Sequence, residues 1–215
     1  MPEQFTDRAD AGRRLAVRLT HLAFSDVVVL ALPRGGVPVA REVATVLSAP
    51  LGLLLVRKIG APGQPELAIG AVADNHPPTT ILDEDLVRRT GASPDYISAS
   101  IEEETRELER RRLRYGPHAR TPDVKGRTVV VVDDGVATGS TLLAALQALR
   151  HAGAIRLVAA VPVIASEALK HLAHAADQWV YLLAPQHFHA VGNYYRDFSQ
   201  LSDDDVMRVL DSRNE

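Results

Sequence analysis

Residues Thr128 to Thr141 read TVVVVDDGVATGST, and this stretch is the most informative one for the fold. An apolar run of strand-forming residues ends in two carboxylates, crosses a loop of small residues and enters a helix rich in hydroxyl groups. In open α/β sheets, ligands bind beyond the carboxyl ends of the strands, where this loop would lie. Small side chains let backbone N–H groups close around a phosphate, and the helix N-terminus adds its positive dipole end. The stretch therefore predicts a phosphate-binding loop.

Asp133 and Asp134 stand directly before that loop, where their negative charge would repel a phosphate unless they face another group. They fit if they accept hydrogen bonds from sugar hydroxyls or lie near a metal ion. An ordinary glycine-rich turn with two solvated aspartates is the alternative. The combination of strand, acid pair, small loop and hydroxyl-rich helix start favours a binding site.

Short apolar runs elsewhere in the chain are continuous rather than alternating, which is typical of strands buried on both faces of a parallel sheet. With the run described above, the expected strands are 27–32, 51–56, 128–132, 157–164 and 178–183. The expected helices lie between them, at 7–21, 37–47, 141–152 and 166–176. This alternation predicts a doubly wound, mainly parallel α/β sheet flanked by helices.

One segment, 82–115, breaks the alternation with two helical stretches, of which the second, 98–115, is dense in charge. It is interpreted as an exposed, solvated helix, with a subunit contact or a lid as the alternatives. We expect a single domain over residues 1–215, with a helical insert at 82–115 and a small C-terminal hood at 184–215.

The composition excludes several classes of protein. Hydrophobic residues make up 46% of the chain and charged residues 24%, which is ordinary for a globular protein. A net charge of −3 offers no basic surface for nucleic acid, and the absence of cysteine removes thiol nucleophiles and disulfides. The polar N-terminus and the short apolar runs, about eight residues at most against roughly 20 for a membrane span, predict a cytoplasmic protein without a membrane partner.

The stretch 128–141 closely resembles the signature of the type I phosphoribosyltransferases, which bind 5-phosphoribosyl-1-pyrophosphate (PRPP). That signature has four apolar residues, two acids, a variable stretch and then Thr-Gly-x-Thr. The resemblance implies that Asp133 and Asp134 bind the ribose hydroxyls. It also implies that the 5′-phosphate is bound by the loop residues Ala137, Thr138, Gly139, Ser140 and Thr141. A Walker A loop is excluded because GxxxxGK[ST] is missing.

A second family feature, a pyrophosphate loop after the first strand, matches LALPRGGVP at 30–38. Arg34 offers a fork of donors to phosphate oxygens, and Gly35 and Gly36 allow unusual backbone angles beside a helix start. Family members often hold a non-proline cis peptide here, so Pro33–Arg34 and Arg34–Gly35 are the candidate bonds. A plain turn between strand and helix is the alternative.

Arg57 and Lys58 follow the second expected strand and resemble the Arg-Lys pair that contacts pyrophosphate in adenine and orotate phosphoribosyltransferases. Surface charge is the alternative. The next residues, 60–66, are placed like the flexible loop that closes over the site in the family and excludes water. Glu66 is the candidate acid of that loop.

The C-terminal stretch QHFHAVGNYYRDF at 186–198 is loosely similar to the base-binding region of purine phosphoribosyltransferases. Val191 and Tyr194 are the candidates for contact with the base, and Arg196 for pyrophosphate. His187 and His189 are interpreted as solvated or hydrogen-bonded residues, because two histidines alone make a poor metal site.

Over residues 26–198, the resemblance implies transfer of the phosphoribosyl group from PRPP to a nitrogenous base, with a purine-like acceptor favoured. The expected cofactor is Mg²⁺, held mainly through PRPP and water, with Asp133 and Asp134 as candidate ligands. Hypoxanthine-guanine enzymes place a catalytic aspartate where this chain has Ala137, so the acceptor is left open. The alternatives are a PRPP- or nucleotide-binding regulator with little catalysis and a different α/β phosphate-binding enzyme. Dimers are common in the family, so the resemblance implies a homodimer.

Overall fold

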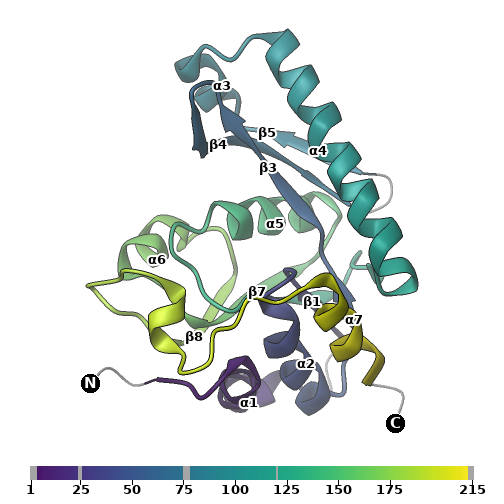
Figure 1. Cartoon of the computed structure of the whole chain (residues 1–215), viewed down its shortest axis with the longest axis vertical. Coiled ribbons are helices and arrows are strands. Elements are labelled where there is room, and N and C mark those ends of the chain that lie inside the picture. Colours follow the sequence, from purple (N-terminus) through teal and green to yellow (C-terminus); the bar gives the residue numbers. More distant parts are fainter. Residues whose placement is uncertain (1–3, 24–25, 75–77, 120, 213–215) are drawn as a thin grey trace.

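The computed structural model describes residues 4–23, 26–74, 78–119 and 121–212. Its main body is a mainly parallel sheet flanked by helices, as the sequence predicted, and its five strands lie in the order β2-β1-β6-β7-β8. Figure 1 shows this sheet between helices on its two faces. The strands are β1 (Val27–Ala31), β2 (Leu51–Leu53), β6 (Thr128–Val132), β7 (Arg156–Val163) and β8 (Gln178–Leu183).

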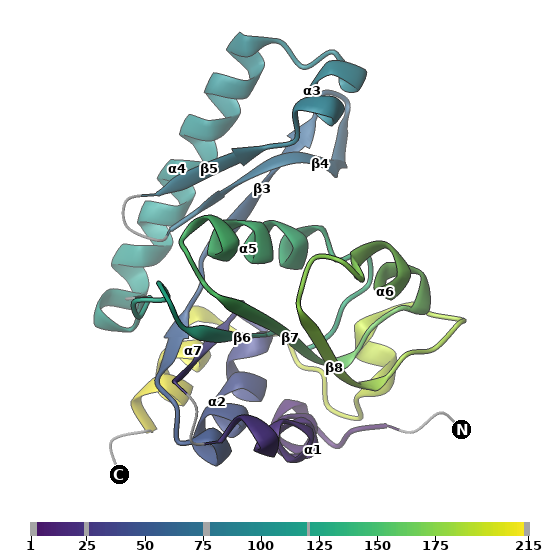
Figure 2. The ribbon, with the colours of Figure 1, turned by 180° about the vertical axis from the view of Figure 1, so that it is seen from behind.

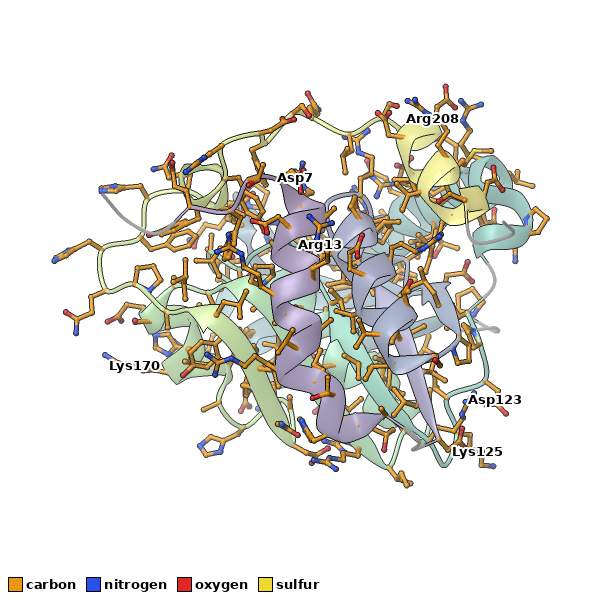
Figure 3. All side chains as sticks on the ribbon, turned by 90° about the horizontal axis from the view of Figure 1, so that it is seen from below. Asp7, Arg13, Asp123, Lys125, Lys170 and Arg208 are labelled. Atoms are coloured by element: carbon orange, nitrogen blue, oxygen red, sulfur yellow. The ribbon has the colours of Figure 1, made fainter. Side chains whose placement is uncertain are left out.

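Two helical layers cover the sheet. Helices α1 and α2 lie side by side on one face, which Figure 3 views directly, and α5 and α6 lie on the other (Figure 2). Alternate residues of β1 face the two layers, with Val29 among the residues packed with α1 and α2 and Leu30 among those packed with α5 and α6. Because both faces are covered, the strands read as continuous apolar runs. The four helices are α1 (Arg8–Leu19), α2 (Gly36–Leu47), α5 (Ser140–His151) and α6 (Ser166–Leu172).

The apolar run at 51–56 is not one strand, as predicted, because the chain leaves the parallel sheet inside it. Strand β2 ends at Leu53, and Leu54 and Leu55, which follow it, are buried in the two different core clusters. Val56 then begins a second, antiparallel sheet made of β3 (Val56–Ala61), β4 (Gln64–Ala73) and β5 (Thr79–Leu82). Burial continues through the change of sheet, so hydrophobicity alone does not mark it.

The expected loop at 60–66 is the tip of a β-hairpin rather than an irregular loop. Ala61 pairs with Gln64, and Gly63 takes a positive φ of 71° at the turn between them. A register irregularity at Gly60 bends the hairpin, and a side chain there would meet the backbone of Pro65 at 2.7 Å.

The segment 82–115 forms two helices, α3 (Glu84–Thr90) and α4 (Pro94–Tyr115), after Leu82 has closed β5. Helix α4 begins earlier than predicted, because Ser93 accepts a hydrogen bond from the backbone of Tyr96 and proline occupies the first turn. In Figure 1, β3 to β5 with α3 and α4 stand over α5. We call this part, residues 56–74 and 78–115, the lobe.

After β8, the chain forms an irregular segment with one 3₁₀ turn (η3, Val191–Tyr194) and the C-terminal helix α7 (Asp203–Asp211). We keep the name hood for residues 184–202 alone, since the rest of the segment expected at 184–215 contains the separate helix α7. The other 3₁₀ turns are η1 (Thr20–Leu22) and η2 (Gly116–Ala119). Arg41 of α2 donates to the carbonyls of Val209 and Ser212, which holds α7 against the body. In the parts of the chain that are described, no helix is both long and apolar enough to cross a membrane.

Candidate active site

The two acids predicted to bind a ligand follow β6 at the carboxyl edge of the parallel sheet. Asp133 accepts a hydrogen bond from the backbone N–H of Asp134, at 2.9 Å. Burial, and then the negative charge of Asp134, raise the pKa of Asp133 well above its usual value. Burial also raises the pKa of Asp134, while Arg8 opposes that rise. Because burial disfavours the charge of the two carboxylates, hydroxyl donors or a cation bound beside them would stabilise their ionised form.

Asp134 is held from several sides. Arg8 of α1 donates from Nε to its Oδ2 at 2.8 Å, and the two side chains are only 10% and 14% exposed. The hydroxyl of Tyr195 donates to the Asp134 carbonyl at 2.5 Å. Burial, together with the charge of Asp134, raises the pKa of Tyr195, so it keeps its proton as a donor. Because these contacts fix both its side chain and its backbone, the carboxylate has one orientation.

The loop after β1 packs directly on the two acids. A side chain at Gly35 would meet Asp134 Oδ2 at 1.9 Å, and one at Gly36 would meet the carbonyl of Val132 at 2.6 Å. Glycine is therefore required at both positions, because the loop backbone lies too close to residues 132–134 to leave room for a side chain. The Pro33–Arg34 peptide bond is cis, one of the two bonds singled out from the sequence. This contact brings together the two motifs that the sequence separates by about a hundred residues.

Arg34 projects from the same loop and is 41% exposed. Its Nη1 lies 3.9 Å from Asp203 Oδ1 at the start of α7, which is a long, weak pair. Asp203 also accepts from the Tyr115 hydroxyl at 2.8 Å, and burial with this bond raises the pKa of Tyr115 to about 12. Arg34 is therefore available to an anion.

The phosphate-loop residues lie between β6 and α5 as expected. Val136 forms a bridge with Ile164, and Gly139 takes a φ of 80° before Ser140 begins the helix. A side chain at Gly139 would strike Leu172 of α6 at 2.2 Å. The first turn of α5 presents backbone N–H groups that have no acceptor within the helix. Exposed residues beside it are Ala137, Thr138 and Thr141.

An open pocket of about 450 Å³ lies against Asp134 and the loop after β1. Its walls come from α1, the two loops and the hood. The lining residues are Arg8, Arg34, Gly35, Asp134, Phe198, Gln200 and Leu201. Arg8 is paired with Asp134 and stacks on Phe198, so Arg34 is the cation of this lining that an anionic group can meet. Phe198 and Leu201 add apolar surface, so the pocket can hold a ligand that carries both anionic and apolar parts.

Lys58 and Glu66 meet on the β3–β4 hairpin, where Lys58 Nζ lies 2.7 Å from Glu66 Oε2. Glu66 also lines a smaller groove of about 220 Å³ between the lobe and α5, which includes Ser140 of the phosphate loop. Arg57 points to the other face of the hairpin, since neighbouring strand residues alternate. There its Nε pairs with Glu104 of α4 at 2.6 Å. The structure therefore separates Arg57 from Lys58, and Arg57 lines neither pocket.

The three hood candidates have different surroundings. A side chain at Gly135 would meet Val191 at 2.5 Å, so Val191 lies beside the acid pair. Tyr194 is buried, its ring stacks on Phe188 with centroids 5.6 Å apart, and it belongs to a small apolar core. Arg196 is exposed and lines neither pocket. Of the three, only Val191 contacts the motif at 133–135.

Comparisons with known proteins show the family to which the chain belongs. A family model described as the phosphoribosyl transferase domain matches residues 3–191. The chain belongs to the phosphoribosyl transferase family. Two curated Mycobacterium tuberculosis proteins with the provisional name phosphoribosyl transferase are 47% identical over 207 residues, which is 96% of this chain and 46% of theirs. The chain thus spans about half the length of those relatives. A crystal structure of a Thermus thermophilus protein matches with a TM-score of 0.88 and 43% identity, over 96% of this chain and 97% of that one.

Sequence reasoning missed two residues that touch the acid pair of this phosphoribosyl transferase domain. Arg8 lies 126 residues before its partner, among several arginines of α1 that look alike in sequence. Tyr195 directly follows the chosen Tyr194, and only the hood conformation decides which of the two faces the site. Neither residue has a spacing signal that could have identified it.

The carboxylate oxygens of the acid pair fit the Mg²⁺ that the family is expected to use, provided that the substrate supplies further ligands. Among the described residues, no group of three or more His, Cys, Asp or Glu could hold a metal ion. Asp133 and Asp134 supply carboxylate oxygens at one place. Mg²⁺ keeps several waters and is commonly held by one or two carboxylates with substrate phosphates, and such a site needs no further protein ligand.

Proposed function

We propose that this chain is an Mg²⁺-dependent phosphoribosyltransferase that moves the 5-phosphoribosyl group from PRPP to a nitrogenous base, with a purine-like base favoured. The observation that carries the proposal is the contact of Gly35 and Gly36 with the Asp133–Asp134 motif. PRPP carries a ribose diol beside a pyrophosphate, so it would reach both loops at once. Membership of the family supports the same reaction class.

In the proposed reaction, the bond from ribose C1 to the pyrophosphate oxygen breaks, and its electron pair leaves on that oxygen. A bond from C1 to a ring nitrogen of the base forms, and the nitrogen releases its proton to solvent. Positive charge develops on the ribose as the leaving group departs. Mg²⁺, when bound, would stabilise the charge on the departing pyrophosphate.

The chain's own residues would hold the substrate in register. Asp133 and Asp134 would accept hydrogen bonds from the ribose hydroxyls, which fixes C1 relative to the base. The backbone N–H groups of 137–141 and the hydroxyls of Thr138, Ser140 and Thr141 would bind the 5′-phosphate. Arg34 and the N–H groups at Gly35 and Gly36 would bind pyrophosphate in place of the weak contact with Asp203.

Around this centre, Val191 is the candidate for contact with the base, since it lies against Gly135. Lys58 and Glu66 lie on the hairpin beside Ser140, and we propose that they add to the phosphate site when the hairpin approaches it. Arg57, Tyr194 and Arg196 have no part in the proposal because of their positions. A cytoplasmic homodimer is proposed by analogy with the family.

A second candidate function is a PRPP- or nucleotide-binding regulator with little or no catalysis. Ala137 favours it, because this exposed position carries no acid or base that could move a proton of the acceptor. Release of pyrophosphate in the presence of a base distinguishes the enzyme from the regulator, since both would bind PRPP.

The test is calorimetric titration of the protein with PRPP, with and without Mg²⁺. We expect saturable binding that Mg²⁺ strengthens and that Asp133→Asn/Asp134→Asn weakens by about tenfold or more, since each buried charged hydrogen bond contributes about 1.5–3 kcal/mol. Bases are then screened for pyrophosphate release.

The matched control is Glu102→Gln/Glu103→Gln, which neutralises two adjacent, exposed acids of α4 outside both pockets. Its PRPP affinity should equal that of the wild type. No wild-type binding at millimolar PRPP would refute the proposal, and equal losses in both double variants would refute the ribose role of the acid pair.

A further inference from the structure

We propose that Arg8 is a positioning residue for the ribose site, because its guanidinium fixes the Asp134 carboxylate and the hood in one arrangement. The inference rests on the proposed binding of PRPP and extends it to a residue outside both family motifs. It also gives helix α1 a direct part in the site.

Three contacts converge on the Arg8 side chain. Nε donates to Asp134 Oδ2 at 2.8 Å, and Nη1 donates to the backbone carbonyl of Ser199 at 3.0 Å. The guanidinium carbon lies 3.9 Å from the centre of the Phe198 ring, so the planar group stacks on the hood. Two nitrogens of one rigid fork therefore hold a carboxylate from β6 and a carbonyl from the hood at a fixed separation.

Burial distinguishes Arg8 from the neighbouring arginine Arg13. Arg8 is among the few charged residues that are buried, whereas the Arg13 side chain is 57% exposed and lies 3.7 Å from Glu42 of α2 (Figure 3). A buried cation requires a partner that compensates its lost hydration, and here the partner is a residue proposed to bind substrate.

The charge of Arg8 also matters for the acid pair. Asp133 and Asp134 are adjacent carboxylates, and the ion pair found for them among the described residues is with Arg8. Gly35 leaves no room for Asp134 to move toward the loop after β1. Without Arg8, the carboxylate would lose its fixed orientation, and the hood would lose the hydrogen bond at the Ser199 carbonyl.

A lysine cannot replace this arrangement. Its ammonium is a single point of charge and could reach Asp134 or the Ser199 carbonyl, but it cannot hold both with the planar geometry of the guanidinium or stack on Phe198 in the same way. Arg8→Lys should therefore keep part of the function, and Arg8→Met, which keeps the length but no charge, should keep less.

The experiment compares the affinities of two ligands, PRPP and inorganic pyrophosphate, by calorimetry with Mg²⁺. The variants are Arg8→Met, Arg8→Lys, and Asp134→Asn alone and combined with Arg8→Met. Arg13→Met, on the same helix, is the control. Thermal unfolding of each variant shows whether it is folded at the temperature of the titration.

For Arg8→Met we expect the Kd for PRPP to rise on the order of tenfold, as for other residues that orient a ligand-binding side chain. The Kd for pyrophosphate, which has no ribose, should stay within about twofold of that of the wild type. Arg8→Lys should be intermediate. In the Asp134→Asn background, Arg8→Met should add little, because residues that act as a unit are not additive.

Each other outcome overturns a specific statement. If the wild type binds PRPP and Arg8→Met binds it equally well, or loses pyrophosphate to the same extent, Arg8 is only a structural residue. If Arg8→Met is unfolded, Arg8→Lys decides by the same two affinities, and wild-type affinities would overturn the positioning role. If the wild type binds pyrophosphate and not PRPP, the proposed function itself is overturned.

Discussion

Gly35→Ala tests the contact between the two loops, which is the basis of the proposed site. The new methyl group would lie 1.9 Å from Asp134 Oδ2, and it must gain about 1.1 Å to reach 3.0 Å, the shortest separation that real side chains tolerate. Arg8 and the Tyr195 hydroxyl hold Asp134 in place, so the strain is shared between the acid and the loop. Gly35 has an ordinary helical φ of −60°, and alanine therefore adds no backbone penalty of its own.

Two magnitudes follow from this displacement. Overpacking of this kind costs about 1–3 kcal/mol of stability, which leaves a domain of this size folded. A shift of about 1 Å in a substrate-positioning group reduces turnover on the order of 100-fold. The expected result is a folded protein, by urea unfolding, with strongly weakened PRPP binding by calorimetry and, once a base is found, slower pyrophosphate release.

The control is Gly63→Ala at the hairpin tip, where a side chain would meet nothing within 4 Å and only the positive φ is unfavourable. A Gly35→Ala protein whose PRPP affinity stays within twofold of the wild type would show that the two loops do not bind one ligand.

Two further predictions concern stability and the lobe. Burial raises the pKa of Asp133 above 3.8. Between about pH 4 and the raised pKa, the folded state therefore binds a proton that the unfolded chain has released. The free energy of unfolding of the wild type falls as the pH rises through this range. Asp133→Asn should therefore be more stable than the wild type at pH 7 without ligand, and the difference in urea unfolding should vanish below about pH 4; equal stabilities at both pH values would contradict this. Arg57→Ala removes the partly exposed pair with Glu104 and should cost about 0.2–1 kcal/mol with unchanged PRPP affinity. A loss of affinity in calorimetry would instead return Arg57 to the pyrophosphate site.

The sequence predicted the parallel sheet because β1, β6 and β7 are buried on both faces and each is followed by a helix. It predicted the start of the phosphate loop well, since β6 occupies 128–132 and α5 begins at Ser140, one residue from the expected position. It failed at 51–56, where Leu54 and Leu55 stay buried while the chain passes to another sheet. Local hydrophobicity reports burial and does not report the sheet to which a residue belongs.

The site was predictable only where its residues stand in consecutive motifs. Asp133, Asp134 and the glycines of the two loops have fixed spacings that the sequence displays. Arg57 and Lys58 are neighbours in sequence, yet strand alternation sends them to opposite faces of the hairpin. Contacts such as Arg8 to Asp134 depend on how α1 packs, and that information is distributed over the whole core.

The N-terminal segment and the hood are joined as neighbouring strands would be. Phe5 donates to the Tyr194 carbonyl at 2.8 Å and accepts from Arg196 at 2.9 Å, and Arg8 reaches Ser199, 191 residues away along the chain. Protein synthesis at about 5–20 residues per second separates the appearance of Arg8 and Ser199 by about 10–40 s. Only in the last part of that interval, between Thr141 and Ser199, does a nascent chain carry both phosphate loops without the complete hood that faces them. The order of synthesis thus makes the proposed ribose site mature only after both of its loops have been made.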